Sequence, residues 1–355
     1  MLLIATKGCR QWLVSLICEK PTQASGACHR SLQLVQLLNE NGWQLNEIEH
    51  PKDPSSRLET VRRGLLGAFR NGPLKPLGLD SLRAQGHVMN LVDQLHQRWP
   101  QLDGVLLEGT GYGDLCAVAE WKRRMVRTVL VPANIESLAP NIESWTHQKR
   151  DVSERFAHER RWWAMADSIF TISMEETWWL QLHGINAEYL PYYPNQQRKD
   201  KLLEVREERQ EKTSLDWLWL ADFRNPANQS GVPLTLKWLN ESRSHPKQLM
   251  IAGRGCEWLT KKYGYQLPEY AQVLGEITDH ELEEFYKSCG AMLIVHPATS
   301  GMLTRVVDAA IAGIPVVGNS MALKSYASHF DEQRVIATPQ RSFRAEEFLM
   351  KTLNS

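Results

Sequence analysis

The sequence of 355 residues lacks several features that would assign a class of protein at once. Lysine plus arginine equals aspartate plus glutamate, 41 of each, so there is no basic excess for neutralising nucleic-acid phosphates, and we expect no nucleic-acid partner. No apolar run approaches the roughly 20 residues that a membrane-spanning helix needs. The six cysteines form no C-x-x-C pair, which argues against zinc and thioredoxin motifs. We therefore expect a cytoplasmic protein with reduced thiols.

Common catalytic motifs are also missing. The chain has no G-x-x-x-x-G-K-[ST], G-x-S-x-G or H-E-x-x-H pattern, which leaves P-loop nucleotidases, α/β-hydrolases and zincins without support. It has no Asp-x-Asp pair to suggest a metal site. Residues 109–113 (GTGYG) follow an apolar strand, but they lack the spacing of a dinucleotide-binding loop. A nicotinamide or flavin site is therefore disfavoured.

What the sequence does contain is a repeated alternation of short apolar runs and longer amphipathic stretches. In the first half, strands are expected at 13–18, 43–48, 104–107, 127–131, 168–172 and 188–190. Helices are expected between them at 29–41, 81–98, 114–124, 152–166 and 174–183. This order predicts a parallel sheet with helices on both faces.

A charged stretch interrupts the alternation at residues 195–214, and it is either a solvated helix or a crossing between domains. The alternation then restarts. Strands are expected at 216–220, 248–252, 272–274, 291–295, 314–317 and 334–337, and helices at 230–244, 279–288, 302–312 and 344–353. We predict an N-terminal Rossmann-like domain (1–196), a charged linker (197–214), a C-terminal domain (215–338) and a final helix (339–355). Two doubly wound domains would hold a ligand cleft at the carboxyl ends of both sheets.

The segment 291–317 (AMLIVHPATSGMLTRVVDAAIAGIPVV) carries the strongest hint of chemistry. A glycine near a helix start, Gly301, lets backbone N–H groups approach an anion. Arg305 adds positive charge, and Asp308 shares its helical face. This spacing suits a diphosphate with a neighbouring carboxylate for two sugar hydroxyls. It equally suits an Arg305–Asp308 pair on the helix surface beside an ordinary helix cap.

This segment resembles the donor-site motif of retaining, GT-B-fold glycosyltransferases of family 4. The segment matches the parts of this motif in order. They are a strand, a P-x-x-x-G-S-G-type loop, a helix with a basic and an acidic residue, and an A-x-A-x-G-x-P-V-V run. The matching residues are Pro297, Ser300, Gly301, Arg305, Asp308, Ala309, Ala312, Gly313, Pro315, Val316 and Val317. Segments 21–30, 134–136, 159–173, 217–228, 249–253 and 273–286 resemble other parts of the same family.

The resemblance implies a GT-B fold with a nucleotide-sugar site in the second domain and an acceptor site in the first. It implies donor-site roles for Arg224, Gly253, Ser300, Gly301, Arg305 and Asp308, and acceptor-side roles for Gly26, Arg30, Asn134 and Glu136. The implied reaction moves a sugar from a nucleotide-sugar to a glycan, a lipid-linked sugar or a small molecule. Retention of configuration is expected, with neither a metal nor a resident cofactor. The final helix is expected to return to the first domain.

The chain departs from the family at several positions. Ser300 and Asp308 stand where the family commonly has glutamate, Leu303 where some members have arginine, and Ala133 where many have histidine. No lysine follows Arg224 in its loop. The alternative function is therefore a GT-B protein that does not transfer sugar, either a sugar-nucleotide isomerase or a binding protein that has lost catalysis.

Two further features leave alternatives open. His296 ends an expected strand at the cleft, where it is either a catalytic, sugar-contacting residue or a structural one. Residues 121–124 (WKRR) and 160–163 (RRWW) combine tryptophan with basic residues. They suit either a peripheral contact with the inner face of a membrane or packing on amphipathic helices, with the basic ends reaching solvent.

Overall fold

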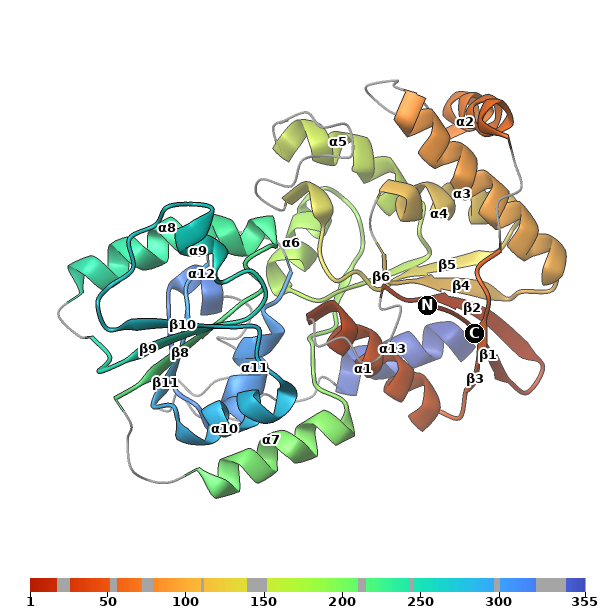
Figure 1. The fold of residues 1–355 in the computed structure, drawn as a ribbon. Helices are drawn as coiled ribbons and strands as arrows, with labels where there is room; N and C mark the ends of the chain where they lie inside the picture. The colour runs from red at the N-terminus through yellow and green to blue at the C-terminus, as the bar shows by residue number, and fades with distance from the viewer. Residues whose placement is uncertain are drawn as a thin grey trace.

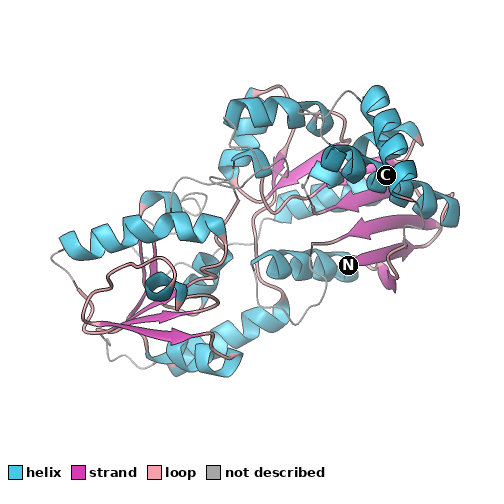
Figure 2. Ribbon diagram, turned by 45° about the horizontal axis from the view of Figure 1, so that its top comes forward, coloured by secondary structure: helices cyan, strands magenta, loops and turns pink. Residues whose placement is uncertain are grey.

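The computed structural model describes residues 1–17, 26–51, 56–71, 79–109, 112–138, 152–209, 215–242, 245–296, 301–323 and 343–354. Their strands form two separate sheets, one of seven strands and one of five, and helices lie against both (Figures 1 and 2). None of the helices in these ranges is long and apolar enough to cross a membrane.

The seven-stranded sheet is mixed, whereas the sequence predicted a parallel one. Its order is β3 (Gln44–Ile48), β1 (Leu2–Lys7), β2 (Arg10–Ser15), β4 (Gly104–Leu107), β5 (Arg127–Leu130), β6 (Ser168–Thr171) and β7 (Glu188–Tyr189). Strands β2 and β4–β7 run parallel, but β1 is antiparallel to both β2 and β3. The prediction missed β1, which turns directly into β2 through Gly8 at φ +61°.

Alternate residues of the first sheet enter two cores. On one face, Leu2, Ile4 and Leu13 pack with α3 (Leu79–Arg98), α4 (Tyr112–Arg123), α5 (Val152–Trp163) and α6 (Met174–Leu182). On the other face, Leu3, Ala5, Trp12 and Val14 pack with α1 (Gly26–Glu40) and α13 (Phe343–Asn354). Helix α2 (Arg57–Asn71), which the sequence did not predict, lies outside this sandwich against α3 (Figure 1).

The five-stranded sheet is parallel throughout, as its βα alternation predicted. Its order is β10 (Ala271–Gly275), β9 (Leu249–Ala252), β8 (Trp217–Leu220), β11 (Ala291–Ile294) and β12 (Val316–Gly318). One face packs against α7 (Gln196–Glu208), α10 (Asp279–Ser288) and α11 (Thr304–Ile311). The other packs against α8 (Pro226–Glu241) and α9 (Trp258–Lys261), and α12 (Ser320–Leu323) follows β12.

Most of the charged stretch that interrupted the sequence pattern forms α7. Asn195 caps this helix by accepting a hydrogen bond from the backbone N–H of Arg198. Only Leu202 and Val205 are buried, and they pack into the core shared with α10 and α11. Residues 210–214 and the predicted strand 334–337 lie outside the described residues. Helix α13 brings the chain back to the first sheet, where Leu349, Met350 and Leu353 are buried.

Candidate functional site

The strand order of the second sheet reverses between β8 and β11, because β9 and β10 lie on one side of β8 and β12 lies on the far side of β11. Ligands of open parallel sheets bind at the carboxyl ends of the strands at such a reversal. Arg305 of α11 lies at this point. Its Nη1 donates to the Leu220 carbonyl at 2.9 Å, at the carboxyl end of β8, and its Nη2 donates to Asn228 Oδ1 at 3.3 Å.

Glycines let the backbone turn tightly at the same edge. Gly253, Gly275 and Gly301 follow or end β9, β10 and β11 with φ of +113°, +89° and +76°. A Cβ added at Gly301 would lie 2.8 Å from the Ala133 carbonyl oxygen and 3.2 Å from Asn134 Cβ. The loop before α11 therefore lies directly against the loop after β5. This contact brings together two residues that the sequence assigned to opposite sides of the site, Gly301 and Asn134.

A buried carboxylate joins these two loops. Glu176 Oε1 accepts the backbone N–H of Ile135 at 2.6 Å and that of Gly301 at 3.0 Å. Glu176 lies in the first turn of α6 and is 1% exposed. Glu176 was not among the site residues predicted from the sequence. The S-x-x-E spacing from the N-cap Ser173 was the available signal, but that spacing predicts a helix cap and does not indicate a contact 125 residues away.

Asp308 lies in the second turn of α11 and is 2% exposed. Its Oδ2 accepts hydrogen bonds from Arg198 Nη2 at 2.9 Å and Nε at 3.3 Å, and its Oδ1 accepts one from the Tyr192 hydroxyl at 3.3 Å. His29 Nδ1 of α1 is 3.8 Å from Oδ2. The alternative interpretation, an Arg305–Asp308 pair on the helix surface, is therefore wrong, because Asp308 faces α7 and α1 while Arg305 reaches β8.

Burial changes the pKa values of the ionisable groups around Asp308. It lowers the pKa of His29, and the nearby Asp308 carboxylate only partly opposes this effect. Burial is also the largest single effect on Arg198 and lowers its pKa, but the charge and hydrogen bond of Asp308, together with Tyr286 and Tyr192, outweigh it and raise that pKa above its ordinary value. Arg198 is therefore a permanent cation beside Asp308.

The first sheet has its own reversal between β2 and β4, and two buried charged residues lie there. Arg30 of α1 is fully buried, and its Nη1 donates to Gln33 Oε1 at 2.6 Å and to the Pro191 carbonyl at 3.3 Å. Its Nε and Nη2 have no acceptor among the described residues. Glu108, after β4, accepts the Ser31 hydroxyl at 2.5 Å and the Ile17 N–H at 2.9 Å. Burial raises the pKa of Glu108 to about 7 and lowers that of Arg30 to about 10.

The remaining predicted residues are more scattered. Arg224 pairs with Asp222 at 3.1 Å on the exposed loop after β8. His296 is 2% exposed at the end of β11, and its backbone N–H and carbonyl both bond the Asn319 side chain. Gly26 begins α1, and Glu136 begins a 3-10 turn, Glu136–Leu138. Ser300 lies outside the described residues.

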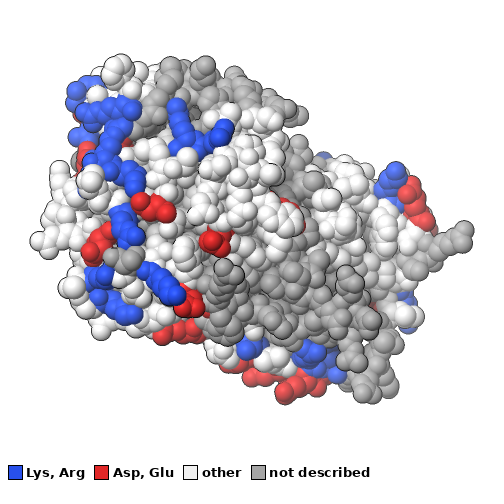
Figure 3. Space-filling model, turned by 180° about the vertical axis from the view of Figure 1, so that it is seen from behind, with Lys and Arg blue, Asp and Glu red and all other residues white. Residues whose placement is uncertain are grey.

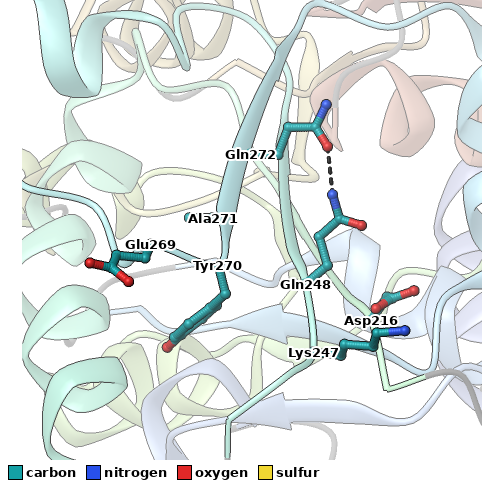
Figure 4. Close-up of a pocket in the computed structure, with 7 residues that line it drawn as sticks. All are labelled: Asp216, Lys247, Gln248, Glu269, Tyr270, Ala271 and Gln272. Carbon is teal, nitrogen blue, oxygen red and sulfur yellow. Dashed lines mark hydrogen bonds between the residues drawn. The ribbon is translucent and has the colours of Figure 1, made fainter.

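A groove of about 290 Å³ lies at the opposite edge of the second sheet, near the amino ends of β8, β9 and β10 (Figure 4). Its lining includes Asp216, Lys247, Glu269 and Tyr270. The Gln248 side chain donates to Gln272 Oε1 across it at 2.6 Å. This groove is remote from the carboxyl edge where the predicted residues lie. In the described parts of the chain, no group of three or more His, Cys, Asp or Glu residues could hold a metal ion.

Comparison with known proteins gives no match to a family model and none to a curated protein. Among solved structures, Anabaena Alr3699/HepE in complex with UDP aligns over 86% of this chain and 88% of its own, with 12% identity and a TM-score of 0.50. An S. aureus TarM mutant in complex with UDP aligns over 75% of this chain and 52% of its own, with 8% identity and a TM-score of 0.47. The chain thus has the GT-B fold that its sequence predicted.

Proposed function

We propose that this protein is a glycosyltransferase that moves a sugar from a nucleotide-sugar to an acceptor held by the first sheet. One observation carries the proposal: the strand reversal of the second sheet lies at Arg305 and the Gly301 loop, and this loop contacts the carboxyl-edge loop of the first sheet at Asn134. The Anabaena protein with this fold binds UDP. A uridine diphosphate-sugar is therefore the first donor to test.

The donor half of the proposed site is the carboxyl edge of the second sheet. Its cationic side chains suit the binding of a departing diphosphate. Arg305 is held at the end of β8, and Arg224 lies on the loop that follows the same strand. The amino end of α11 adds its helix dipole. Fixed cationic groups and dipoles of this kind stabilise the charge that grows on the leaving group, so the proposed reaction uses no metal. Asp308 is proposed to accept the ribose hydroxyls.

The acceptor half is formed by the carboxyl ends of β2, β4 and β5. Arg30 and Glu108 lie there as a buried cation and a carboxyl whose pKa is about 7. A carboxyl that titrates near neutral pH is suited to accepting a proton from an acceptor hydroxyl. We propose that acceptor chemistry takes place on this side, with Asn134 at the boundary between the two halves. His296 is the proposed sugar-side residue, at the end of β11.

A second function is favoured by a specific observation: the groups assigned to the nucleotide already have protein partners. The Asp308 carboxylate accepts three hydrogen bonds, and the Gly301 N–H donates to Glu176. A GT-B protein that no longer transfers sugar, or that binds nucleotide-sugar without turnover, would keep such closed contacts. The two functions differ in turnover, since only a transferase releases UDP in the presence of an acceptor.

The test is calorimetric titration with UDP and with UDP-glucose in EDTA, repeated with Mg²⁺. We expect binding in EDTA that Mg²⁺ does not strengthen. Asp308→Ala should weaken UDP binding at least tenfold, because a charge-assisted hydrogen bond contributes about 1.5–3 kcal/mol and 1.4 kcal/mol is one decade. Glu241→Ala, which removes an exposed carboxylate at the end of α8 in the same domain, is the matched control and should leave the affinity within about twofold.

Three results would contradict the proposal. Binding that required Mg²⁺ would refute the metal-free mechanism. Equal affinity of Asp308→Ala and wild type, with the fold intact by circular dichroism, would remove Asp308 from the site. UDP binding without UDP release, after a screen of glycan, lipid-linked and small-molecule acceptors, would favour the non-transferring alternative.

A further inference from the structure

Helix α2 has an outward face that is both apolar and basic. Leu58, Leu65 and Phe69 are 83%, 52% and 91% exposed, and Leu66 beside them is 40% exposed. Their spacing of seven and four residues places Leu58, Leu65 and Phe69 on one side of the helix. Single exposed apolar residues are ordinary on protein surfaces, but four large ones on one 15-residue helix are unusual.

The opposite face of α2 is fixed tightly to the protein. A Cβ added at Gly64 would lie 1.8 Å from the Leu82 carbonyl oxygen, and one added at Gly86 of α3 would lie 1.9 Å from the Thr60 carbonyl oxygen. Arg63 pairs with Asp93 of α3 at 2.7 Å. The backbones of the two helices therefore touch, and α2 cannot roll to bury its apolar face. That face is presented to the outside by the geometry of the fold.

Arginines lie around the apolar side chains. Arg57, Arg62 and Arg70 are exposed on α2, and Glu59 is its one acidic residue. Arg62 is held beside Glu59 by two hydrogen bonds of 2.8 Å, which leaves Arg57 and Arg70 near the two ends of the helix. Seen from behind, lysines and arginines gather on the side of the molecule that carries the first sheet and its helices (Figure 3).

We propose that α2 docks this protein on the surface of an anionic lipid bilayer. The apolar side chains would enter the boundary between headgroups and acyl chains, and the arginines would meet lipid phosphates. A convex helix with protruding leucine and phenylalanine side chains suits a deformable surface. A second copy of this chain fits less well, because symmetric pairing of the face would bring the arginines of both copies together.

This surface differs from the one that the sequence indicated. The tryptophans of the two basic segments, Trp121, Trp162 and Trp163, are at most 1% exposed, so they cannot enter a membrane. For those segments the packing alternative is correct. The exposed apolar side chains that the membrane contact requires are instead on α2, at the outer side of α3.

The experiment is sedimentation of the full chain with vesicles of phosphatidylcholine alone or with 30% phosphatidylglycerol, at low and high salt. We expect binding to the anionic vesicles that is at least tenfold stronger than to the neutral ones and that weakens with salt. Leu58→Ser/Phe69→Ser should lower the vesicle affinity at least tenfold, and Arg57→Gln/Arg70→Gln should remove most of the preference for anionic lipid. Leu234→Ser, on α8 of the other sheet and 46% exposed, is the control.

These substitutions are at exposed positions, and circular dichroism of each variant checks that the fold is kept. Absence of vesicle binding, equal binding to neutral and anionic vesicles, or an equal loss in Leu234→Ser would overturn the proposal. Light scattering supplies the remaining test. A dimer of the wild type that Phe69→Ser converts to a monomer would show that a second copy covers this face, and the lipid assignment would be wrong.

Discussion

At the scale of single residues, Glu108 shows how position in the fold changes an ordinary side chain. Its Oε2 accepts two hydrogen bonds, but it is fully buried and its Oε1 has no donor among the described residues. Burial disfavours the carboxylate and raises the pKa of Glu108 to about 7, although Ser31, Ile17 and Arg30 oppose the shift. The folded protein therefore binds a proton here that the unfolded chain has already released near pH 6.

This difference predicts a specific pH dependence. Between the unfolded pKa near 4.5 and the folded pKa near 7, the folded state binds more protons, so the free energy of unfolding falls as pH rises. The fall levels off above pH 7 and amounts to about 3 kcal/mol. Glu108→Gln should remove this fall. Urea unfolding of wild type and variant at pH 5, 6, 7 and 8 measures it, and parallel curves for the two proteins would show that Glu108 does not titrate in this range.

The residues of the candidate site differ in how far the sequence could predict them. Gly301, Arg305 and Asp308 were found because one strand–loop–helix segment fixes their spacing. Glu176 and Arg198 reach the same place from α6 and α7, which are 125 and 110 residues away in the chain. No local pattern encodes contacts of that separation. The sequence therefore indicates the segment that we propose for the donor, but not the partners that hold it.

At the scale of elements, α2 and α3 form a helix pair whose contact depends on glycine. Gly86→Ala would place a methyl group 1.9 Å from the Thr60 carbonyl, so the helices must separate. We expect a loss of about 2–3 kcal/mol in the free energy of unfolding, the size typical of overpacking against rigid backbone. Urea unfolding followed by tryptophan fluorescence measures this loss.

Gly184→Ala is the matched control for the helix pair. Gly184 has φ of +74° and no atom within 4 Å of the added methyl, so the change costs only the backbone strain, about 1 kcal/mol. A loss in Gly86→Ala no greater than in Gly184→Ala would mean that α2 moves freely on α3. This result would contradict our inference that contact with α3 holds the apolar face of α2 outward.

Strand β1 and helix α2 were not predicted from the sequence, nor were the short helices α9 and α12, and for β1 and α2 there is a physical reason. Strand β1 is joined to β2 by a turn of only Gly8 and Cys9, so residues 2–15 lack the intervening helix on which the βα pattern depends. Helix α2 turns its leucines and phenylalanine outward and its glycines inward, the reverse of an ordinary surface helix. The alternating elements of the second sheet follow the usual pattern, and there the prediction was accurate to within a few residues at each end.

At the scale of the whole molecule, the Glu176 carboxylate couples the two sheets. It accepts one backbone N–H from each half, at Ile135 and at Gly301. We propose that the Gly301 N–H donates a hydrogen bond to the diphosphate of the nucleotide-sugar. Glu176 then competes with the nucleotide for this N–H group. The negative charge of Glu176 also repels the diphosphate.

Glu176→Gln should therefore strengthen UDP binding by about fivefold. The amide still accepts a hydrogen bond, but it loses the charge that makes the carboxylate the stronger acceptor. Calorimetric titration measures the change, and Glu175→Gln, the same loss of charge one residue earlier, is the control. Weaker UDP binding in Glu176→Gln, or an equal gain in both variants, would show that the carboxylate supports the site rather than competing for it.

The return of α13 to the first sheet has a consequence for the way the protein is made. The strands of that sheet leave the ribosome first, but the core on one of its faces includes Leu349, Met350 and Leu353. While the second sheet is being synthesised, Leu3, Val14 and Phe170 on this face lack the cover that α13 later provides. We therefore expect nascent chains halted before α13 to bind chaperones and to aggregate more than the full chain does. The first sheet is synthesised before the second, but its core is completed after it.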